Sequence, residues 1–310
     1  MIHHSWLFEG GILAATAIYL HGWFGAVPLS RLMYFVGGLA ILWTAACSPL
    51  AMLDEDLLTA HMVQHLLIML AAAPLVLLGA PGIVFWRVMP APPLLRRIGA
   101  LLAHPIFCWL AGTVTVIVWH VPVIFEAARK SSGLHAVECA SFFAAGLLFW
   151  WPVVEPWPCR PRWPRWSIPL YLFFATMPCD ALSAFLAFSG RLVYPHYLSV
   201  ARPLGMTALQ DQELAGALMW TVVTFAYLAP AAVLTVRLLS PAALNPDLET
   251  RAVRYQRPCP ETDPQNPRER PVKHHHAGAQ SEVIADLPDP QRHDGAAYNS
   301  GAQDPGERPV

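Results

Sequence analysis

The sequence predicts an all-α fold, a polytopic membrane helix bundle of seven transmembrane helices with the N-terminus outside and the C-terminus in the cytoplasm. Hydrophobic residues make up 55% of the chain and charged residues only 13%, whereas soluble domains carry about 25% charge. Several apolar runs reach the roughly 20 residues that a spanning helix needs. Basic residues gather in alternate loops, and this asymmetry predicts the orientation.

Seven apolar segments are expected to span the membrane. The first lacks the positively charged start of a cleaved signal peptide, so we expect it to be a true span. Trp86, Trp119 and Trp166 stand at the ends of later segments, where interfacial aromatic residues are enriched. The expected spans are residues 8–26, 32–51, 60–86, 101–125, 135–154, 168–188 and 214–238.

The loops differ in charge from one side of the expected bundle to the other. The loop after the third span holds Arg87, Arg96 and Arg97, whereas the loop at residues 54–56 is acidic and holds no lysine or arginine. Cytoplasmic loops of membrane proteins carry an excess of basic residues. The acidic loop is therefore expected outside, and an odd number of spans then places the C-terminus in the cytoplasm.

The composition changes after the seventh span, so we expect two domains, residues 1–240 and residues 241–310. The second segment is rich in proline, charge and small polar residues, and it has too little apolar surface to fold alone. We interpret it as a disordered Pro-rich cytoplasmic tail. Its histidine triplet, residues 274–276, is a weak metal-binding signal, because short histidine runs in such tails are more often incidental.

Residues with metal-binding side chains occur at several span ends that the topology places outside. His61 and His65 are four residues apart, so they share one helix face with about 5–6 Å between their Cβ atoms. The fourth span ends near His120, and the fifth begins with His135. Imidazole, thioether and thiolate groups suit Cu(I). The candidate metal ligands are His61, His65, His120, His135, Met62 and Cys139.

Two aspartates in the last spans need an explanation. Asp180 lies deep in the sixth span, where a charged side chain costs roughly 2.5–3.5 kcal/mol, and Pro178 is expected to kink the helix beside it. Asp211 opens the seventh span and is expected to cap that helix. Ala215 and Gly216 follow, and such small residues permit close helix packing.

Four segments together resemble one known family. They read, in order, HMVQHLLIMLAAAPLVLLGAP, VWHVPVIFEAA, HAVECASFFAAGLLFWWPV and DQELAGALMW. Through these four segments and their order, the sequence is similar to the Caa3_CtaG family of cytochrome c oxidase assembly proteins over most of residues 5–240. The resemblance implies a seven-span plasma-membrane protein that is needed to form active haem-copper oxidase. The family histidines correspond to His61, His65, His120 and His135, whereas Cys139 stands where relatives tend to have a second histidine.

These observations lead to one main functional hypothesis and three alternatives. We expect an assembly factor without enzymatic turnover, in a bacterial plasma (inner) membrane, that binds or delivers copper at its outer face. Its expected partners are haem-copper oxidase subunits, periplasmic copper chaperones and membrane lipid, and no nucleic-acid module is present. The alternatives are a haem-binding membrane redox protein, a metal-free assembly scaffold, and a transporter with a midplane site at Asp180 and Pro178.

Overall fold

A computed structural model describes residues 5–23, 27–88, 104–154, 164–200 and 205–240 of the protein. The chain divides into two units, Met1–Glu261 and Thr262–Val310, and all the described residues belong to the first. Every regular element among them is helical, which confirms the predicted all-α class. The expected disordered tail, residues 241–310, lies outside the described residues.

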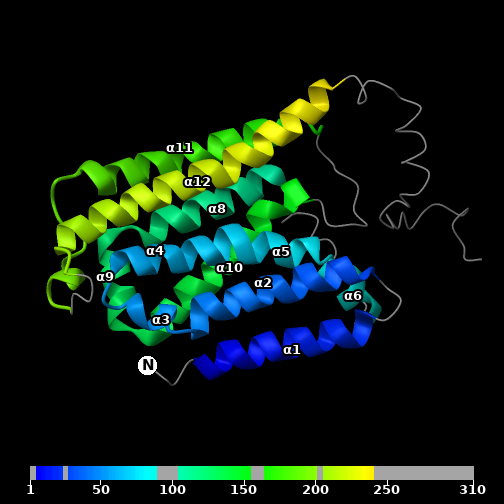
Figure 1. Ribbon diagram of the computed structural model, residues 1–310, viewed down its shortest axis with the longest axis horizontal. Helices are drawn as coiled ribbons and strands as arrows, with labels where there is room; N and C mark the ends of the chain where they lie inside the picture. The colour runs from blue at the N-terminus through cyan, green and yellow to red at the C-terminus, as the bar shows by residue number, and fades with distance from the viewer. Residues whose placement is uncertain (1–4, 24–26, 89–103, 155–163, 201–204, 241–310) are drawn as a thin grey trace, which may run out of the picture. The chain divides into compact units, whose positions relative to one another are not determined.

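The helices pack side by side along a common direction, with short helices at their ends (Figure 1). Most helices are rich in large apolar residues and begin or end at proline, glycine or polar residues. In chain order the elements are α1 (Ser5–Trp23), α2 (Leu29–Cys47), α3 (Leu50–Leu53), α4 (Leu58–Leu66), the π-helix η1 (Leu67–Ala72), α5 (Ala73–Leu78), α6 (Pro81–Val88), α8 (Pro105–Trp119), α9 (Pro122–Lys130), α10 (Ser132–Val154), α11 (Ser167–Phe188), the 3-10 helix η2 (Pro195–Leu198) and α12 (Ala208–Leu239).

Five helical stretches among the described residues are long and apolar enough to cross a membrane, and the bent pair α8 and α9 makes a sixth if it counts as one span. The helix α1 lies beside α2 (Figure 1), but it is not among these candidates. Glu9 and His21 interrupt its apolar sequence. The count of seven spans and the orientation of the termini therefore remain predictions.

Two of the predicted spans are interrupted in the structure, the third by a turn and the fourth by a bend. The third span ends at Leu78 rather than at residue 86, because Ala80 takes a positive φ of 51° and a separate helix begins at Pro81. The expected fourth span bends by 73° between α8 and α9. Pro122 begins α9 and cannot donate a backbone hydrogen bond to continue α8. The bend turns α9 against α10 and η2, which carries Arg129 towards the start of α10.

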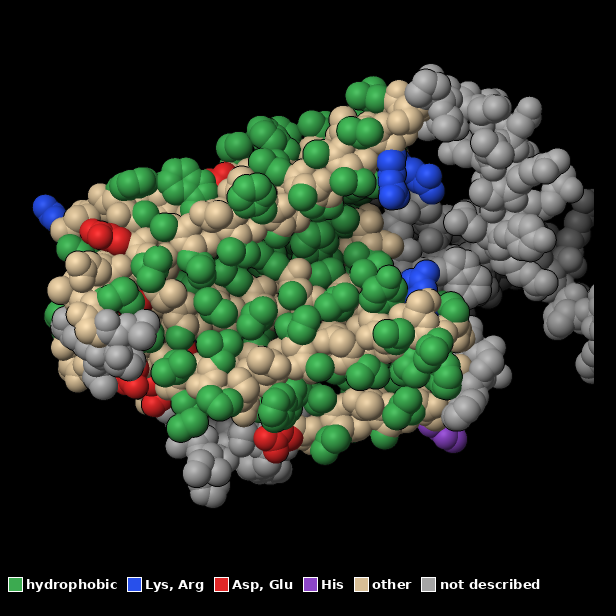
Figure 2. Space-filling model, in the orientation of Figure 1, with side chains coloured by type: hydrophobic (Ala, Val, Ile, Leu, Met, Phe, Trp, Pro, Cys, Tyr) green, Lys and Arg blue, Asp and Glu red, His purple; other side chains and the backbone are tan. Residues whose placement is uncertain are grey.

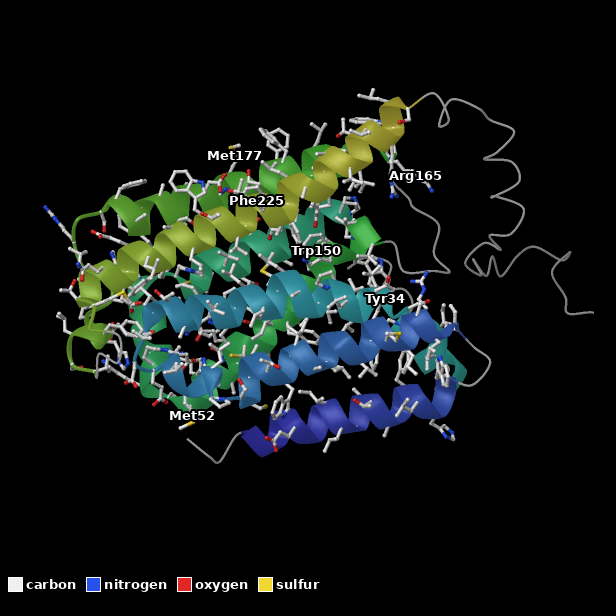
Figure 3. The ribbon with its side chains drawn as sticks, in the orientation of Figure 1. Tyr34, Met52, Trp150, Arg165, Met177 and Phe225 are labelled. Atoms are coloured by element: carbon white, nitrogen blue, oxygen red, sulfur yellow. The ribbon has the colours of Figure 1, made fainter. Side chains whose placement is uncertain are left out.

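The outer surface of the bundle is apolar, as expected for helices in lipid. Figure 2 shows hydrophobic side chains covering the visible face along the helices, with charged side chains mainly near the ends. Phe225 on α12 points outward in Figure 3 and is 70% exposed, whereas Trp150 lies inside the bundle. The pattern supports membrane insertion of this helical domain.

The two helices α11 and α12 approach each other closely at Gly216, which confirms the expected role of the small residues there. A Cβ atom on Gly216 would lie 2.8 Å from the backbone nitrogen of Ala187 and 2.9 Å from the carbonyl oxygen of Ser183. Both contacts are with backbone atoms, so neither can rotate away. The approach explains why a glycine stands at this position in the interior of a spanning helix.

We expect Gly216→Ala to destabilise the protein by about 1–3 kcal/mol, because the added methyl group forces the two helices apart. The midpoint of thermal unfolding in detergent would measure the loss. The matched control is Gly37→Ala on α2, where a Cβ atom meets nothing within 4 Å. Equal midpoints for the two variants would contradict the close packing.

Candidate metal centre

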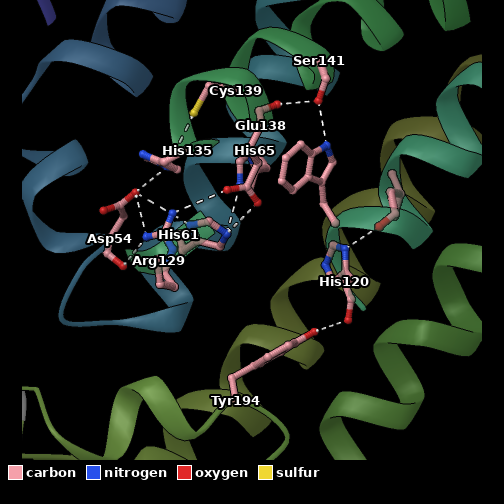
Figure 4. A network of polar contacts seen from close by, with 12 residues as sticks. Asp54, His61, His65, His120, Arg129, His135, Glu138, Cys139, Ser141 and Tyr194 are labelled. Atoms are coloured by element: carbon pink, nitrogen blue, oxygen red, sulfur yellow. Dashed lines mark hydrogen bonds and ion pairs between the residues drawn. The ribbon is translucent and has the colours of Figure 1, made fainter. Parts of the chain in front are cut away.

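A cluster of ionisable side chains lies at one end of the bundle, where the loop before α4 meets α4, α9 and α10 (Figure 4). Its members make imidazole, carboxylate and guanidinium contacts with one another. All the side chains are at most 6% exposed except that of His135, which is 19% exposed. The polar cluster consists of Asp54, His61, His65, Arg129, His135 and Glu138.

The predicted pairing of His61 and His65 is confirmed by their geometry. Their Nε2 atoms are 3.0 Å apart, and the two rings meet edge to face with centroids 4.3 Å apart. The ring of His65 also stacks on Phe142, at 4.2 Å between centroids. Four-residue spacing on α4 places both imidazoles on one helix face, and packing against α10 holds the second ring in place.

Glu138 on α10 faces both of these histidines. Its Oε1 atom lies 3.3 Å from Nε2 of His65 and 3.5 Å from Nε2 of His61. A buried carboxylate is costly unless it is paired, so this contact with two imidazoles gives it a partner. The three residues offer one donor atom each within 4.8 Å of one another, which is metal-ligand spacing.

Asp54 forms a second group of three with His61 and His135. Its Oδ2 atom lies 3.1 Å from Nε2 of His135 and 3.7 Å from Nδ1 of His61. Burial raises the pKa of the Asp54 carboxyl group, but its close contacts with His135 and His61 and the charge of Arg129 outweigh burial and hold the pKa well below its usual range. The group is therefore ionised at neutral pH and available as an anionic ligand.

Arg129 on α9 lies between the two carboxylates. Its Nη1 atom is 3.4 Å from Oδ2 of Asp54, and its Nη2 atom is 3.6 Å from Oε2 of Glu138. The guanidinium side chain is only 3% exposed, so it neutralises one of two buried negative charges. With neutral histidines the polar cluster carries a net charge of −1, from two carboxylates and one guanidinium, and it favours a bound cation.

The two groups of three share His61, so they form one continuous set of nitrogen and oxygen donors. Two imidazoles with one carboxylate bind zinc, non-haem iron and copper in proteins. The acidic partners are of the kind that orient ligand histidines in metal sites. This arrangement can hold a transition-metal ion in a nearly water-free surrounding.

Helix α12 fixes the start of α4, and this contact corrects the sequence-based role of Asp211. The Asp211 carboxylate accepts hydrogen bonds from the backbone N–H groups of Leu58, at 2.6 Å, and Thr59, at 3.1 Å. It therefore caps α4, whereas Thr207 caps α12 itself through a capping box with Gln210. A capped start holds the first turn of α4, which positions His61 one turn later.

The other predicted ligands lie beside the cluster rather than within it. Cys139 is buried, and its Sγ atom is 3.6 Å from Nε2 of His135. His120 stands at the bend between α8 and α9, where Nδ1 lies 2.7 Å from the carbonyl oxygen of Val116. Met62 and His120 both line a small cavity, which His65 lines as well. Among the residues described, His120 belongs to neither of the two ligand groups.

Three members of the polar cluster were not among the sequence-predicted ligands. Asp54 lies in the acidic loop before the third span, and Glu138 follows His135 by three residues, but neither is among the predicted ligands. Arg129 lies in the segment between the expected fourth and fifth spans. A buried arginine beside two carboxylates leaves no local sequence signal, because its burial depends on the bend before α9.

Comparisons with known proteins identify the family of this chain. A model of the cytochrome c oxidase caa3 assembly factor family (Caa3_CtaG) matches residues 13–240, which include every helix that carries the polar cluster. The chain belongs to the Caa3_CtaG family. The sequence-based resemblance is thereby confirmed.

Relatives of this Caa3_CtaG member include uncharacterised mycobacterial proteins. Those of Mycobacterium bovis and Mycobacterium tuberculosis are each 25% identical to it over 245 residues, and that of Mycobacterium leprae is 24% identical. Each match covers 70% of this chain and 37% of the relative's length. No solved structure gives a significant match.

Proposed function

We propose that this chain is a seven-span assembly factor of the bacterial plasma membrane that binds copper in the polar cluster and delivers it to a haem-copper oxidase. Family membership supports the assembly role. The observation that supports metal handling is the pair of overlapping three-residue groups that share His61, each with its donor atoms within 4.8 Å of one another. Binding and release require no enzymatic turnover.

The charge and position of the cluster favour metal delivery. The cluster sits at an end of the bundle, where a water-soluble copper chaperone or an oxidase subunit can approach. His135 is its most exposed member, so it offers the first ligand to an arriving ion. His61 then joins both ligand groups, which allows an ion to move between them without leaving the cluster.

The proposed orientation places this end outside the cell, as the acidic loop at residues 54–56 predicts. The described part of the chain favours this function over the alternatives. The Nε2 atoms of His61 and His65, 3.0 Å apart, leave no room for a porphyrin between them. Helix α11 continues unbroken past Pro178, whereas transporter sites use discontinuous helices.

Copper content of the purified full-length protein tests the proposal. We expect about one copper ion per wild-type monomer at the cluster, and none there in the double variant His61→Asn/His65→Asn. The control is His21→Asn, since His21 is exposed on α1. Equal copper content in the wild type and the double variant would refute copper binding at the cluster and favour the metal-free scaffold. A Soret band in the absorption spectrum of the purified protein would favour the haem-binding alternative.

A further inference from the structure

A small cavity adjoins the polar cluster at His65, which belongs to the cluster and also lines the cavity. It has a volume of about 30 Å³, enough for a group the size of a water molecule. Its lining comes from α4, η1, α8, α10, α11 and α12. Half of the lining residues carry a sulfur or an imidazole nitrogen. We name it the thioether cavity after these residues, Met62, His65, Met69, His120, Cys179 and Met219.

His120 is held in the orientation of a metal ligand. Its Nδ1 atom is 2.7 Å from the carbonyl oxygen of Val116, to which it donates. Its Nε2 atom, on the opposite edge of the ring, is buried and has no hydrogen-bond partner in the described structure. The residue is only 8% exposed. Ligand histidines typically donate one N–H to a backbone carbonyl and present the other nitrogen to the metal.

His65 belongs to the polar cluster and also lines the thioether cavity. Its Nε2 atom faces His61 and Glu138, and His65 also lines the cavity. Its Nδ1 atom is buried and likewise has no hydrogen-bond partner among the described residues. An unsatisfied buried polar atom costs about 1–3 kcal/mol. Each of the two histidines that line this small cavity therefore carries one buried ring nitrogen that is available to a ligand.

The sulfur-bearing residues that line the cavity come from three separate parts of the chain, which the fold brings together. Met62 and Met69 belong to α4 and η1, Cys179 to α11 and Met219 to α12. Met69 lies within the π-helical turn, where its carbonyl oxygen accepts a 3.0 Å hydrogen bond from Nε1 of Trp150. π-Helical turns occur frequently at functional sites. Thioether, thiol and imidazole donors together suit Cu(I).

The thioether cavity and the polar cluster differ in the charge they offer. None of the described residues lining the cavity is an aspartate or glutamate, whereas the cluster contains Asp54 and Glu138. A divalent ion in the cavity would leave two positive charges without an anionic partner, and burial of such charges is costly. A monovalent soft ion leaves only one positive charge without an anionic partner, and its bonds to sulfur offset the cost of burying that charge.

We propose that the thioether cavity is a second site, selective for Cu(I), and that His65 passes the ion between it and the polar cluster. This inference rests on the proposed function for one step, the entry of copper through the polar cluster. Eight residues separate His61 from Met69, or about 12 Å of helix. The ion would move from nitrogen and oxygen donors to sulfur donors as it travels along α4 into η1.

Titration of the purified full-length protein with Ag(I), a redox-inert probe with the ligand preference of Cu(I), tests the second site. We expect two bound silver ions in wild type and one in Met69→Leu/Met219→Leu, since leucine matches methionine in size and the exchange costs under about 1.5 kcal/mol. The matched control is Met33→Leu/Met52→Leu. Both of these methionines are exposed, at 67% and 74%, and this variant should bind two.

A second pair of substitutions separates the two proposals. His61→Asn/Glu138→Gln disrupts the cluster and should leave one silver ion, bound by the sulfur-bearing residues. In the same variant loaded with Cu(I) instead of silver, X-ray absorption should show sulfur neighbours around the copper. Two ions of unchanged affinity in Met69→Leu/Met219→Leu would overturn the cavity site. A single wild-type ion lost only on cluster substitution would also overturn it while the proposed function stands. A single ion lost only on cavity substitution would uphold the cavity and refute the cluster.

Discussion

Cells whose only copy of this chain carries His61→Asn are expected to contain less than about a tenth of the active cytochrome c oxidase of wild-type cells. His61 contributes to both ligand groups, with Nε2 facing Glu138 and Nδ1 facing Asp54. Loss of a residue that only hydrogen-bonds to a metal ligand lowers metal affinity by about 10–100-fold. Loss of His61, a ligand that both groups share, should lower copper affinity by more than this. The oxidase would be measured by its absorption spectrum and its oxygen consumption in membranes.

Two controls test whether the loss of oxidase is due to weaker copper binding at the polar cluster. His21→Asn on α1 changes an exposed histidine outside the polar cluster and should leave oxidase levels unchanged. Excess copper in the growth medium should partly restore the oxidase in the His61→Asn cells, because weaker binding is offset by higher concentration. Full oxidase activity in His61→Asn cells, with the variant present at its normal level in the membrane, would refute the copper role.

Arg129→Gln is expected to destabilise the metal-free protein by about 3–5 kcal/mol. The guanidinium group contacts Asp54 and Glu138 at once, and its removal leaves two buried carboxylates without a full positive partner, a change that costs this much in buried ion pairs. Thermal unfolding in detergent would measure the effect. The matched control is Arg191→Gln, because Arg191 is exposed, and its unfolding midpoint should stay close to that of wild type.

Metal ions should reverse part of the loss in Arg129→Gln. Without Arg129 the polar cluster carries a net charge of −2 with neutral histidines, so a divalent ion such as Zn²⁺ balances it fully. Zinc should therefore raise the unfolding midpoint of the variant more than that of wild type. An equal response in both proteins would show that Arg129 does not tune the charge of the site, and an unchanged midpoint without metal would show that its ion pairs are not stabilising.

Much of the fold was predictable because membrane burial leaves a simple sequence signal. Long apolar runs predicted helices, and the structure has helices at each of the seven places, although the ends differ. The ends were missed where one residue redirects the chain. Ala80 with its positive φ stops the third span early, and the break before Pro122 bends the fourth. Hydropathy is averaged over many residues and does not register such a turn.

The candidate site was predictable in part. The four-residue spacing of His61 and His65 placed them on one face, and the shared level of span ends brought His135 to them, at 6.0 Å between the ring centroids of His61 and His135. His120 and Met62 were assigned to the same site, but they line the neighbouring cavity. The depth of a residue in the membrane follows from its position along a spanning helix. The direction in which its side chain points depends on how that helix is rotated, and the packing of the helices decides this rotation.

The sequence alone determined that this is a helical membrane protein, that it resembles the Caa3_CtaG family, and that His61 and His65 form a pair, because these properties follow from composition, motif order and helix periodicity. Only the tertiary structure decided that Asp54, Arg129 and Glu138 join that pair, that Asp211 caps a helix distant in sequence, and that sulfur-bearing residues of three regions surround one cavity. The reason is that charge pairing and ligand sets depend on which helices pack together and how each is rotated, and these contacts join residues as far as 153 positions apart in the chain.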